Sequence, residues 1–190
     1  MRETAIIVIA ALALSALVRA FLVQAFYVPS ESMQETLQVS DRIIASKITT
    51  RMSGIQRGEV VVFRDPGGWL PTPPVEQPGI RSVLRTGLVF IGLLPSDSGQ
   101  DLVKRVIGVE GDRVACCDEQ GRIMLNGVSL DEQYVVGATD QVLFDVEVPT
   151  GAIFVMGDNR GDSRDSRFHL EKDNGSVPVD SVVGRAQWLI

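Results

Sequence analysis

The chain opens with a long apolar stretch, and this stretch constrains its fold more than any other feature. Residues 5–18 are apolar or small throughout, Arg19 interrupts them, and apolar residues then continue to Val23. As a helix, residues 5–23 would span roughly 30 Å, which matches the hydrocarbon core of a bilayer. Arg19 lies close enough to one end for its side chain to reach the membrane surface. We therefore expect the rest of the chain to be exported.

Two interpretations of this stretch stay open on the residues alone. A membrane anchor with a cytoplasmic N-terminus is favoured by the basic Arg2, although Glu3 dilutes that signal. A cleaved signal peptide is equally consistent, because residues 23–25 resemble a small-x-small cleavage site. Both interpretations place the following domain outside the cytoplasm.

The remainder of the chain has the pattern of short β-strands separated by glycine- and proline-containing turns. Asn126-Gly127 is a strong hairpin signal within this pattern. The pattern predicts a mainly β fold, with an all-β sandwich or barrel-like domain over residues 26–190 behind an apolar N-terminal helix over residues 1–25 that is either an anchor or a signal peptide. The expected strands are apolar, β-branched runs at residues 39–48, 59–63, 103–109, 113–115, 122–125, 152–156 and 181–186.

A segment rich in proline and glycine interrupts this pattern at residues 67–100. Its prolines do not fit a central strand, so we expect an insertion or lid rather than core. Leu88 to Leu94 is an apolar run within it that is too short to span a membrane. We expect this run to touch the membrane surface at most.

Composition argues against several classes of function. The formal net charge of −6 argues against a nucleic-acid binder, which needs a basic face. His169 is the only histidine, and Cys116 and Cys117 are adjacent, whereas zinc sites use separated pairs. We therefore expect no metal, no cofactor and two reduced thiols rather than a vicinal disulfide.

Two serines, Ser30 and Ser32, follow the apolar stretch and raise the question of a nucleophile. A serine at this place can simply cap a short helix, and it reacts poorly unless a base takes its proton. Lys104 and Lys47 are candidate bases, because each lies in an apolar run. In a strand, Lys104 and Arg105 face opposite sides, so one of them points inward or lies at an edge. Burial would lower the pKa of an inward lysine, whereas a lysine that reaches solvent would stay charged.

Four segments, in this order behind the apolar stretch, together resemble the bacterial type I signal peptidases over most of the chain. Pro29 to Leu37 resembles the nucleophile segment, and Arg57 to Phe63 resembles the strand that follows it. Lys104 to Asp112 resembles the catalytic-lysine segment, and residues 157–167 resemble the last signature, although alone they also fit a turn network of alternating charges. Glu35 stands where the commoner pattern has proline, so that turn is expected to be less rigid.

The resemblance implies a Ser–Lys dyad, which needs no histidine. Ser32 would attack the scissile carbonyl, and Lys104 would accept its proton. Ser30 would lend its hydroxyl, together with the Ser32 backbone N–H, to an oxyanion hole. Ser163 would hydrogen-bond to the lysine and orient it.

Further residues are implied to support this site and to receive the substrate. Asp165 and Arg167 would form a supporting ion pair, with Asp158 beside them. An extended substrate would lie along strand edges and add main-chain hydrogen bonds. The candidates for shallow apolar pockets that admit small residues, typically Ala-x-Ala, are Phe26, Val28, Met33, Leu37 and Val103. The alternative is that these five side chains belong only to the core.

The resemblance thus implies a membrane-anchored serine endopeptidase that removes signal peptides from exported precursors. The anchor would stay uncleaved, with precursors and membrane lipid as partners and the β domain at the outer face of the cytoplasmic membrane. Two alternatives are a peptidase for one dedicated precursor and a non-catalytic anchored β domain that binds peptides or envelope partners. A self-cleaving repressor would need a DNA-binding domain, for which we expect no room.

Overall fold

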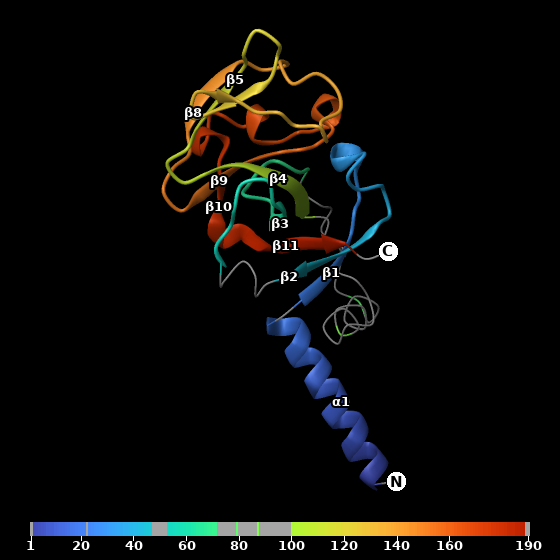
Figure 1. The fold of residues 1–190 in the computed structure, drawn as a ribbon. Helices are drawn as coiled ribbons and strands as arrows, with labels where there is room; N and C mark the ends of the chain where they lie inside the picture. Colours follow the sequence, from blue (N-terminus) through green and yellow to red (C-terminus); the bar gives the residue numbers. More distant parts are fainter. Residues whose placement is uncertain are drawn as a thin grey trace.

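A computed structural model describes residues 2–21, 23–46, 53–71, 79, 87 and 100–188. The helix α1 (Arg2–Phe21) leads into a β domain made of two sheets. Figure 1 shows α1 projecting away from this domain, with its N-terminal end farthest from the sheets. The domain therefore builds its core without α1.

The larger sheet contains seven antiparallel strands in the order β1-β2-β11-β3-β4-β9-β10. Strand β4 lies inside this sheet, between β3 and β9, and carries Lys104 opposite Val61. A break in register between Val106 and Gly108 bends β4 against β9. The strands are β1 (Val23–Tyr27), β2 (Arg42–Ser46), β3 (Val60–Arg64), β4 (Asp101–Val109), β9 (Ala152–Met156), β10 (Val177–Pro178) and β11 (Val182–Trp188).

The smaller sheet contains four strands in the order β7-β6-β5-β8 and lies at the end of the domain far from α1 (Figure 1). Asn126 and Gly127 form the turn of its hairpin, with Leu125 paired to Val128. Both turn residues have positive φ, 53° and 82°, which asparagine and glycine tolerate well. The strands are β5 (Arg113–Cys116), β6 (Ile123–Leu125), β7 (Val128–Ser129) and β8 (Phe144–Glu147).

The strands at the middle of the larger sheet are buried on both faces. In β3, Val60 and Val62 belong to one buried cluster, whereas Val61 and Phe63 belong to another on the opposite face. Strand β9 alternates in the same way between the second of these clusters and a third, which joins the larger sheet to β5, β6 and β8. Period-two alternation between two buried faces explains why these strands appear in the sequence as unbroken apolar runs.

The apolar side chains of α1 from Ala5 to Leu14 are not covered by the β domain. Ile7, Ile9 and Leu14 are 67%, 66% and 64% exposed, and Ile6, Val8 and Leu12 are also exposed. Within the described part of the chain, no helix combines the length and the apolarity needed to cross a membrane.

The mainly β fold expected from the sequence is confirmed, but the N-terminal helix ends earlier than expected. The expected helical unit, residues 1–25, is too long, because α1 ends at Phe21 and residues 23–27 form β1. Pairing with β2 explains the difference, since it sets Phe26 opposite Ile43 and buries both side chains. Apolar continuity alone did not reveal this change from helix to strand.

Some strands of the structure were not expected from the sequence, and most of the expected insertion cannot be compared with the structure. Strand β8 has the partly polar sequence Phe-Asp-Val-Glu, and β7 and β10 have two residues each, so none produces a clear apolar run. Most of the expected insertion, including Leu88 to Leu94, lies outside the described residues.

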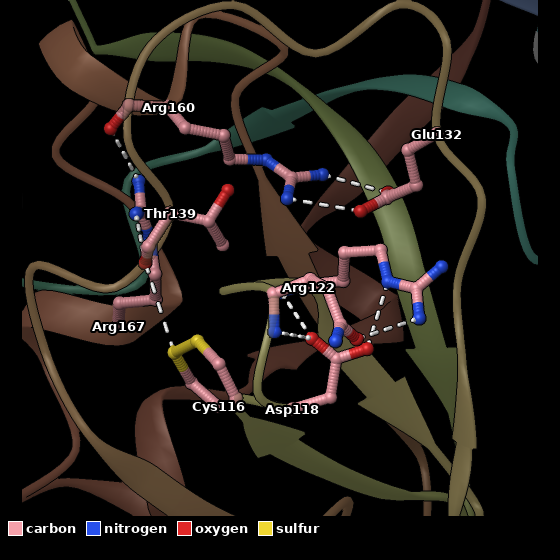
Figure 2. Close-up of a disulfide and its surroundings, with 9 residues drawn as sticks. Cys116, Asp118, Arg122, Glu132, Thr139, Arg160 and Arg167 are labelled. Carbon is pink, nitrogen blue, oxygen red and sulfur yellow. Dashed lines mark hydrogen bonds and ion pairs between the residues drawn. A yellow bond between two sulfur atoms is a disulfide. The ribbon is translucent and has the colours of Figure 1, made fainter.

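The two cysteines differ from the expectation of reduced thiols. A disulfide joins Cys116 to Cys117, and the peptide bond between them is cis. Cys116 ends β5 and Cys117 lies outside the strand, so the alternating faces of a strand do not separate the two side chains. Cys116 Sγ also lies 3.8 Å from the carbonyl oxygen of Thr139 (Figure 2).

Candidate active site

Ser32 lies in a short 3-10 turn, η1 (Glu31–Met33), soon after β1. The chain between β1 and this turn is held in place because the Val28 N–H donates to Asp41 O at 3.0 Å. Met33 is fully buried in the cluster on the β1 side of the sheet, which anchors the turn to the core. Ser32 is therefore held in a defined position with only 6% of its surface exposed.

The structure does not use Ser30 as a helix cap. Ser30 occupies the N-cap position of η1, but its side chain makes no capping hydrogen bond. Its hydroxyl oxygen instead lies 3.1 Å from Ser32 Oγ. Two hydroxyl groups thus stand side by side, so Ser30 can donate to an oxygen that develops charge near Ser32.

The departure from the family pattern at Glu35 has a structural counterpart. The Thr36 N–H donates to Met33 O at 3.0 Å and closes a turn in which Glu35 has a φ of 73°. Proline is locked near −65°, so it does not fit this conformation at position 35. The turn after the serine is therefore built differently from the proline-containing pattern.

Strand β4 brings Lys104 to Ser32. Lys104 Nζ lies 2.5 Å from Ser32 Oγ, and only 2% of the lysine surface is exposed. Arg105, the next residue, is partly exposed and binds Asp158 instead. Of the two adjacent basic residues, Lys104 is therefore the one that points into the core.

Burial lowers the pKa of Lys104 from its usual 10.5 to about 8. The Asp165 carboxylate opposes this shift, the Arg167 guanidinium adds to it, and Asp158 and Asp162 oppose it more weakly. Because Asp165 is itself paired with Arg167, the loss of hydration decides the direction of the pKa shift. An amine with a pKa near 8 is neutral often enough near neutral pH to serve as a general base.

Ser163, Asp165 and Arg167 come together in one buried cluster. The Ser163 hydroxyl donates to Asp165 Oδ2 at 2.7 Å, and Arg167 Nε donates to Asp165 Oδ1 at 2.8 Å. Asp165 also accepts the Gly157 N–H at 3.0 Å, and all three clustered side chains are at most 5% exposed. Since the Ser163 hydroxyl donates to Asp165, its expected bond to Lys104 stays a prediction.

Asp158 links three segments of the site through contacts that the sequence did not reveal. Arg105 Nε and Nη2 donate to its two oxygens at 2.8 and 2.6 Å, and Thr36 Oγ1 donates to Oδ2 at 2.5 Å. These bonds tie β4 and residues 31–36, which we call the serine turn, to residues 157–162, which we call the turn after β9. A sequence signal existed in the pair Lys104-Arg105, because in an apolar strand buried on both faces the second basic residue also loses water and then needs a carboxylate partner.

Gly157 marks the closest approach between the serine turn and the turn after β9. A Cβ atom at this position would lie 2.4 Å from Ser32 O and 2.3 Å from Ser163 Oγ. Any larger residue would push these groups apart, so the position requires glycine. The Asn159 N–H also donates to Ser32 O at 3.1 Å.

The five side chains suggested for substrate pockets lie together in one buried cluster. None is more than 7% exposed, which is the core role that the sequence also allowed. A pocket at this place stays a prediction. The five residues are Phe26, Val28, Met33, Leu37 and Val103.

Of the other candidate groups, His169 has a different neighbour and Lys47 cannot be placed. The His169 ring stacks on Trp69 with 4.5 Å between ring centroids, and burial lowers its pKa. Lys47 lies outside the described residues. No group of three or more histidine, cysteine, aspartate or glutamate side chains among the described residues could hold a metal ion.

We expect the reactivity of Ser32 to increase with the fraction of Lys104 that is neutral. With a pKa near 8, the neutral amine rises from about a tenth of the molecules at pH 7 to about nine tenths at pH 9. We expect the rate at which a serine-directed acylating reagent labels Ser32 to rise with pH in the same way. Mass spectrometry of the labelled peptide measures this rate. Lys104→Arg, which cannot deprotonate, should label slowly at every pH, and a pH-independent wild-type rate would contradict the assignment.

Comparison with known proteins agrees with the resemblance seen in the sequence. Residues 1–190 match the family model described as signal peptidase, peptidase S26. The chain is 37% identical to signal peptidase I of Mycobacterium tuberculosis, with 100% of this chain and 72% of that protein covered. It is 36% identical to a probable signal peptidase I of Mycobacterium leprae, with 99% and 75% covered. A solved signal peptidase I of Enterococcus faecalis is 28% identical with a TM-score of 0.43, covering 69% of this chain and 95% of that one. The expected family is thus confirmed, and the chain belongs to the signal peptidase family, peptidase S26.

Proposed function

We propose that this chain is a serine endopeptidase that removes signal peptides from exported precursor proteins through a Ser32–Lys104 dyad. The observation that carries the proposal is the 2.5 Å approach of a buried lysine amine to a serine hydroxyl. Relatives named signal peptidase I support the class of substrate.

The reaction would proceed in two steps through an acyl-enzyme. Neutral Lys104 takes the hydroxyl proton while Ser32 Oγ attacks the scissile carbonyl carbon. The Ser30 hydroxyl and the Ser32 N–H stabilise the oxyanion, and the protonated lysine then donates its proton to the leaving amine. Lys104, neutral again, takes a proton from the water that attacks the ester carbonyl, and returns it to Ser32 Oγ as the ester C–O bond breaks, which releases the acid and restores both the serine hydroxyl and the neutral amine.

The substrate would bind as an extended strand next to β1, an edge strand that leads to Ser32, and next to residues 101–104 of β4, which include Lys104 and precede the pairing of β4 with β9. Main-chain hydrogen bonds would align the precursor, and side chains would be selected by the space above the buried cluster that contains Val28 and Val103. That cluster is closely packed, with both side chains at most 7% exposed, so we propose that only small residues such as Ala-x-Ala fit before the cut.

We also propose that the N-terminal segment holds the enzyme at the outer face of the cytoplasmic membrane. Apolar side chains of α1 are exposed around the helix, including Ile7, Ile9 and Leu14. Exposed apolar surface of this extent is favourable in lipid and unfavourable in water. The domain division that follows is an anchor at the N-terminus and a β domain behind it, with α1 ending at Phe21.

The dyad is tested by substitution in the full-length enzyme. Ser32→Ala and Lys104→Met should abolish cleavage of a secretory precursor, because one removes the nucleophile and the other the base. Ser30→Ala should lower kcat by roughly 10²- to 10³-fold, since it removes one oxyanion donor. Gel analysis of the cleaved precursor and sequencing of its new N-terminus measure the outcome. His169→Ala is the control variant and should keep its activity. Cleavage of the precursor by Lys104→Met would refute the mechanism. If the wild-type chain binds precursors without cutting them, it is a non-catalytic binding domain.

Selection of small residues is tested on the substrate. Replacing the alanine before the cut with phenylalanine should lower kcat/KM by at least about 10²-fold, because the ring would need space that the buried cluster does not leave. The matched control places the same substitution several residues after the cut, where cleavage should continue. Equal kcat/KM for both precursors would contradict the proposed pockets.

Attachment to the membrane is tested by extraction and by charge. The wild-type protein should stay with membranes in alkaline carbonate, because apolar burial rather than surface charge holds it. Ile9→Arg combined with Leu14→Arg should release it, since each charge within the bilayer costs about 2.5–3.5 kcal/mol on insertion scales. Val128→Arg, on an exposed edge of the smaller sheet, is the control. A soluble wild-type protein whose mature chain begins near Phe26 would show that the segment is a cleaved signal peptide.

A further inference from the structure

We infer that Glu132 is a positioning residue for the Ser32–Lys104 site and acts on it through Arg160. Glu132 belongs to the segment between β7 and β8, residues 130–143, which connects two strands of the smaller sheet but packs against the turn after β9. The inference rests on the proposed function, because it concerns the rate of the reaction at that site.

The segment between β7 and β8 is joined to the turn after β9 by main-chain hydrogen bonds. The Val136 N–H donates to Asp158 O at 2.9 Å, and the Arg160 N–H donates to Val136 O at 2.7 Å. Val136 and Asn159 form a parallel bridge, so the two segments run side by side. A Cβ on Gly137 would lie 2.7 Å from Gly161 N, which shows how closely they approach.

Arg160 is fully buried and joins Glu132 to Gly157. Its Nη1 and Nη2 donate to the two oxygens of Glu132 at 3.0 and 2.7 Å, in the paired geometry visible in Figure 2. Its Nε donates to Gly157 O at 2.9 Å. A guanidinium keeps its charge when buried and therefore requires a carboxylate, which Glu132 supplies from a different part of the fold.

The neighbouring carboxylates already have arginine partners of their own. Asp158 pairs with Arg105, and Asp165 pairs with Arg167. Arg167 Nη2 also donates to Arg160 O at 3.0 Å, so the backbone of Arg160 is held from the other side (Figure 2). Glu132 is consequently the acidic group on which the orientation of the Arg160 side chain depends.

The contact with Gly157 gives Arg160 its influence on the reacting groups. Gly157 lies directly against Ser32 O and Ser163 Oγ, where even a Cβ atom does not fit. A shift of the Gly157 peptide would therefore move the serine turn relative to Lys104. Misplacement of reacting atoms by about 1 Å can cost on the order of 10²-fold in rate.

Tyr134 connects Glu132 to the other side of the site. Its hydroxyl donates to Glu132 Oε1 at 2.7 Å, and burial together with this bond raises the pKa of Tyr134, so the donor proton is retained. The Arg105 guanidinium lies 3.9 Å above the Tyr134 ring while it binds Asp158. Glu132 thus contacts Arg160 directly and Arg105 through Tyr134.

The test compares Glu132→Gln with wild type in the full-length enzyme, with functional sites counted by stoichiometric acylation of Ser32. We expect kcat per labelled site to fall about 10- to 100-fold while KM stays within about threefold, because positioning acts on the reaction step. Asp145→Asn is the matched control, since Asp145 pairs with Arg113 on the exposed side of the smaller sheet. The control should leave both constants unchanged. A purely structural role would lower the number of labelled sites and leave kcat per site unchanged, which would overturn the inference.

Two further variants make the result decisive. Arg160→Gln and the double variant Glu132→Gln/Arg160→Gln should be about equally slow, because both residues act along one path. If the losses in kcat of the two single variants multiply in the double variant, the inference is overturned.

If Glu132→Gln yields no labelled sites, Tyr134→Phe decides, since it removes only the hydroxyl bonded to Glu132. Its kcat per site should fall about 2- to 10-fold, and an unchanged kcat would overturn the inference. Cleavage by wild type but not by Ser32→Ala tests the proposed function separately.

Discussion

The burial of the Lys104 amine against Ser32 is the constraint on which the rest of the structure depends. Folding lowers the pKa of this group from 10.5 to about 8, which corresponds to about 3 kcal/mol against the charged form. Below pH 8 the lysine is charged in both folded and unfolded chains, so the folded state carries this cost. The cost disappears as the pH rises from about 8 to 10.5, where the unfolded lysine remains protonated and the folded one does not. The fold therefore gives up some stability at neutral pH to keep a partly neutral amine close to the serine.

The arrangement of arginines and carboxylates around the site protects that neutral amine. A free carboxylate near Lys104 would favour its charged form and raise its pKa. Asp165 and Asp158 do act in this direction, but each is bound by an arginine, and Arg167 acts against the effect. The paired groups thus hold the backbone of the site through many hydrogen bonds, while burial still sets the direction of the Lys104 pKa shift.

The sequence supported a large part of this description because some features depend only on neighbouring residues. The apolar runs of β3, β4 and β9 and the Asn126-Gly127 turn were visible as local patterns. The start of β1 was missed, because a strand that continues an apolar helix has no local boundary signal. The disulfide between Cys116 and Cys117 was also missed, since it depends on how the chain turns at the end of β5.

By itself, the sequence indicated that the chain has an apolar N-terminus, a β domain and, in the pair Lys104-Arg105, one basic residue that points inward or lies at an edge. Only the tertiary structure decided what each of these groups contacts. Ser32 and Lys104 are 72 residues apart, and Arg160 and Glu132 are 28 apart, so their contacts depend on strand order and register. A two-residue alternation specifies which face of a strand a side chain occupies, but not which distant segment packs against that face.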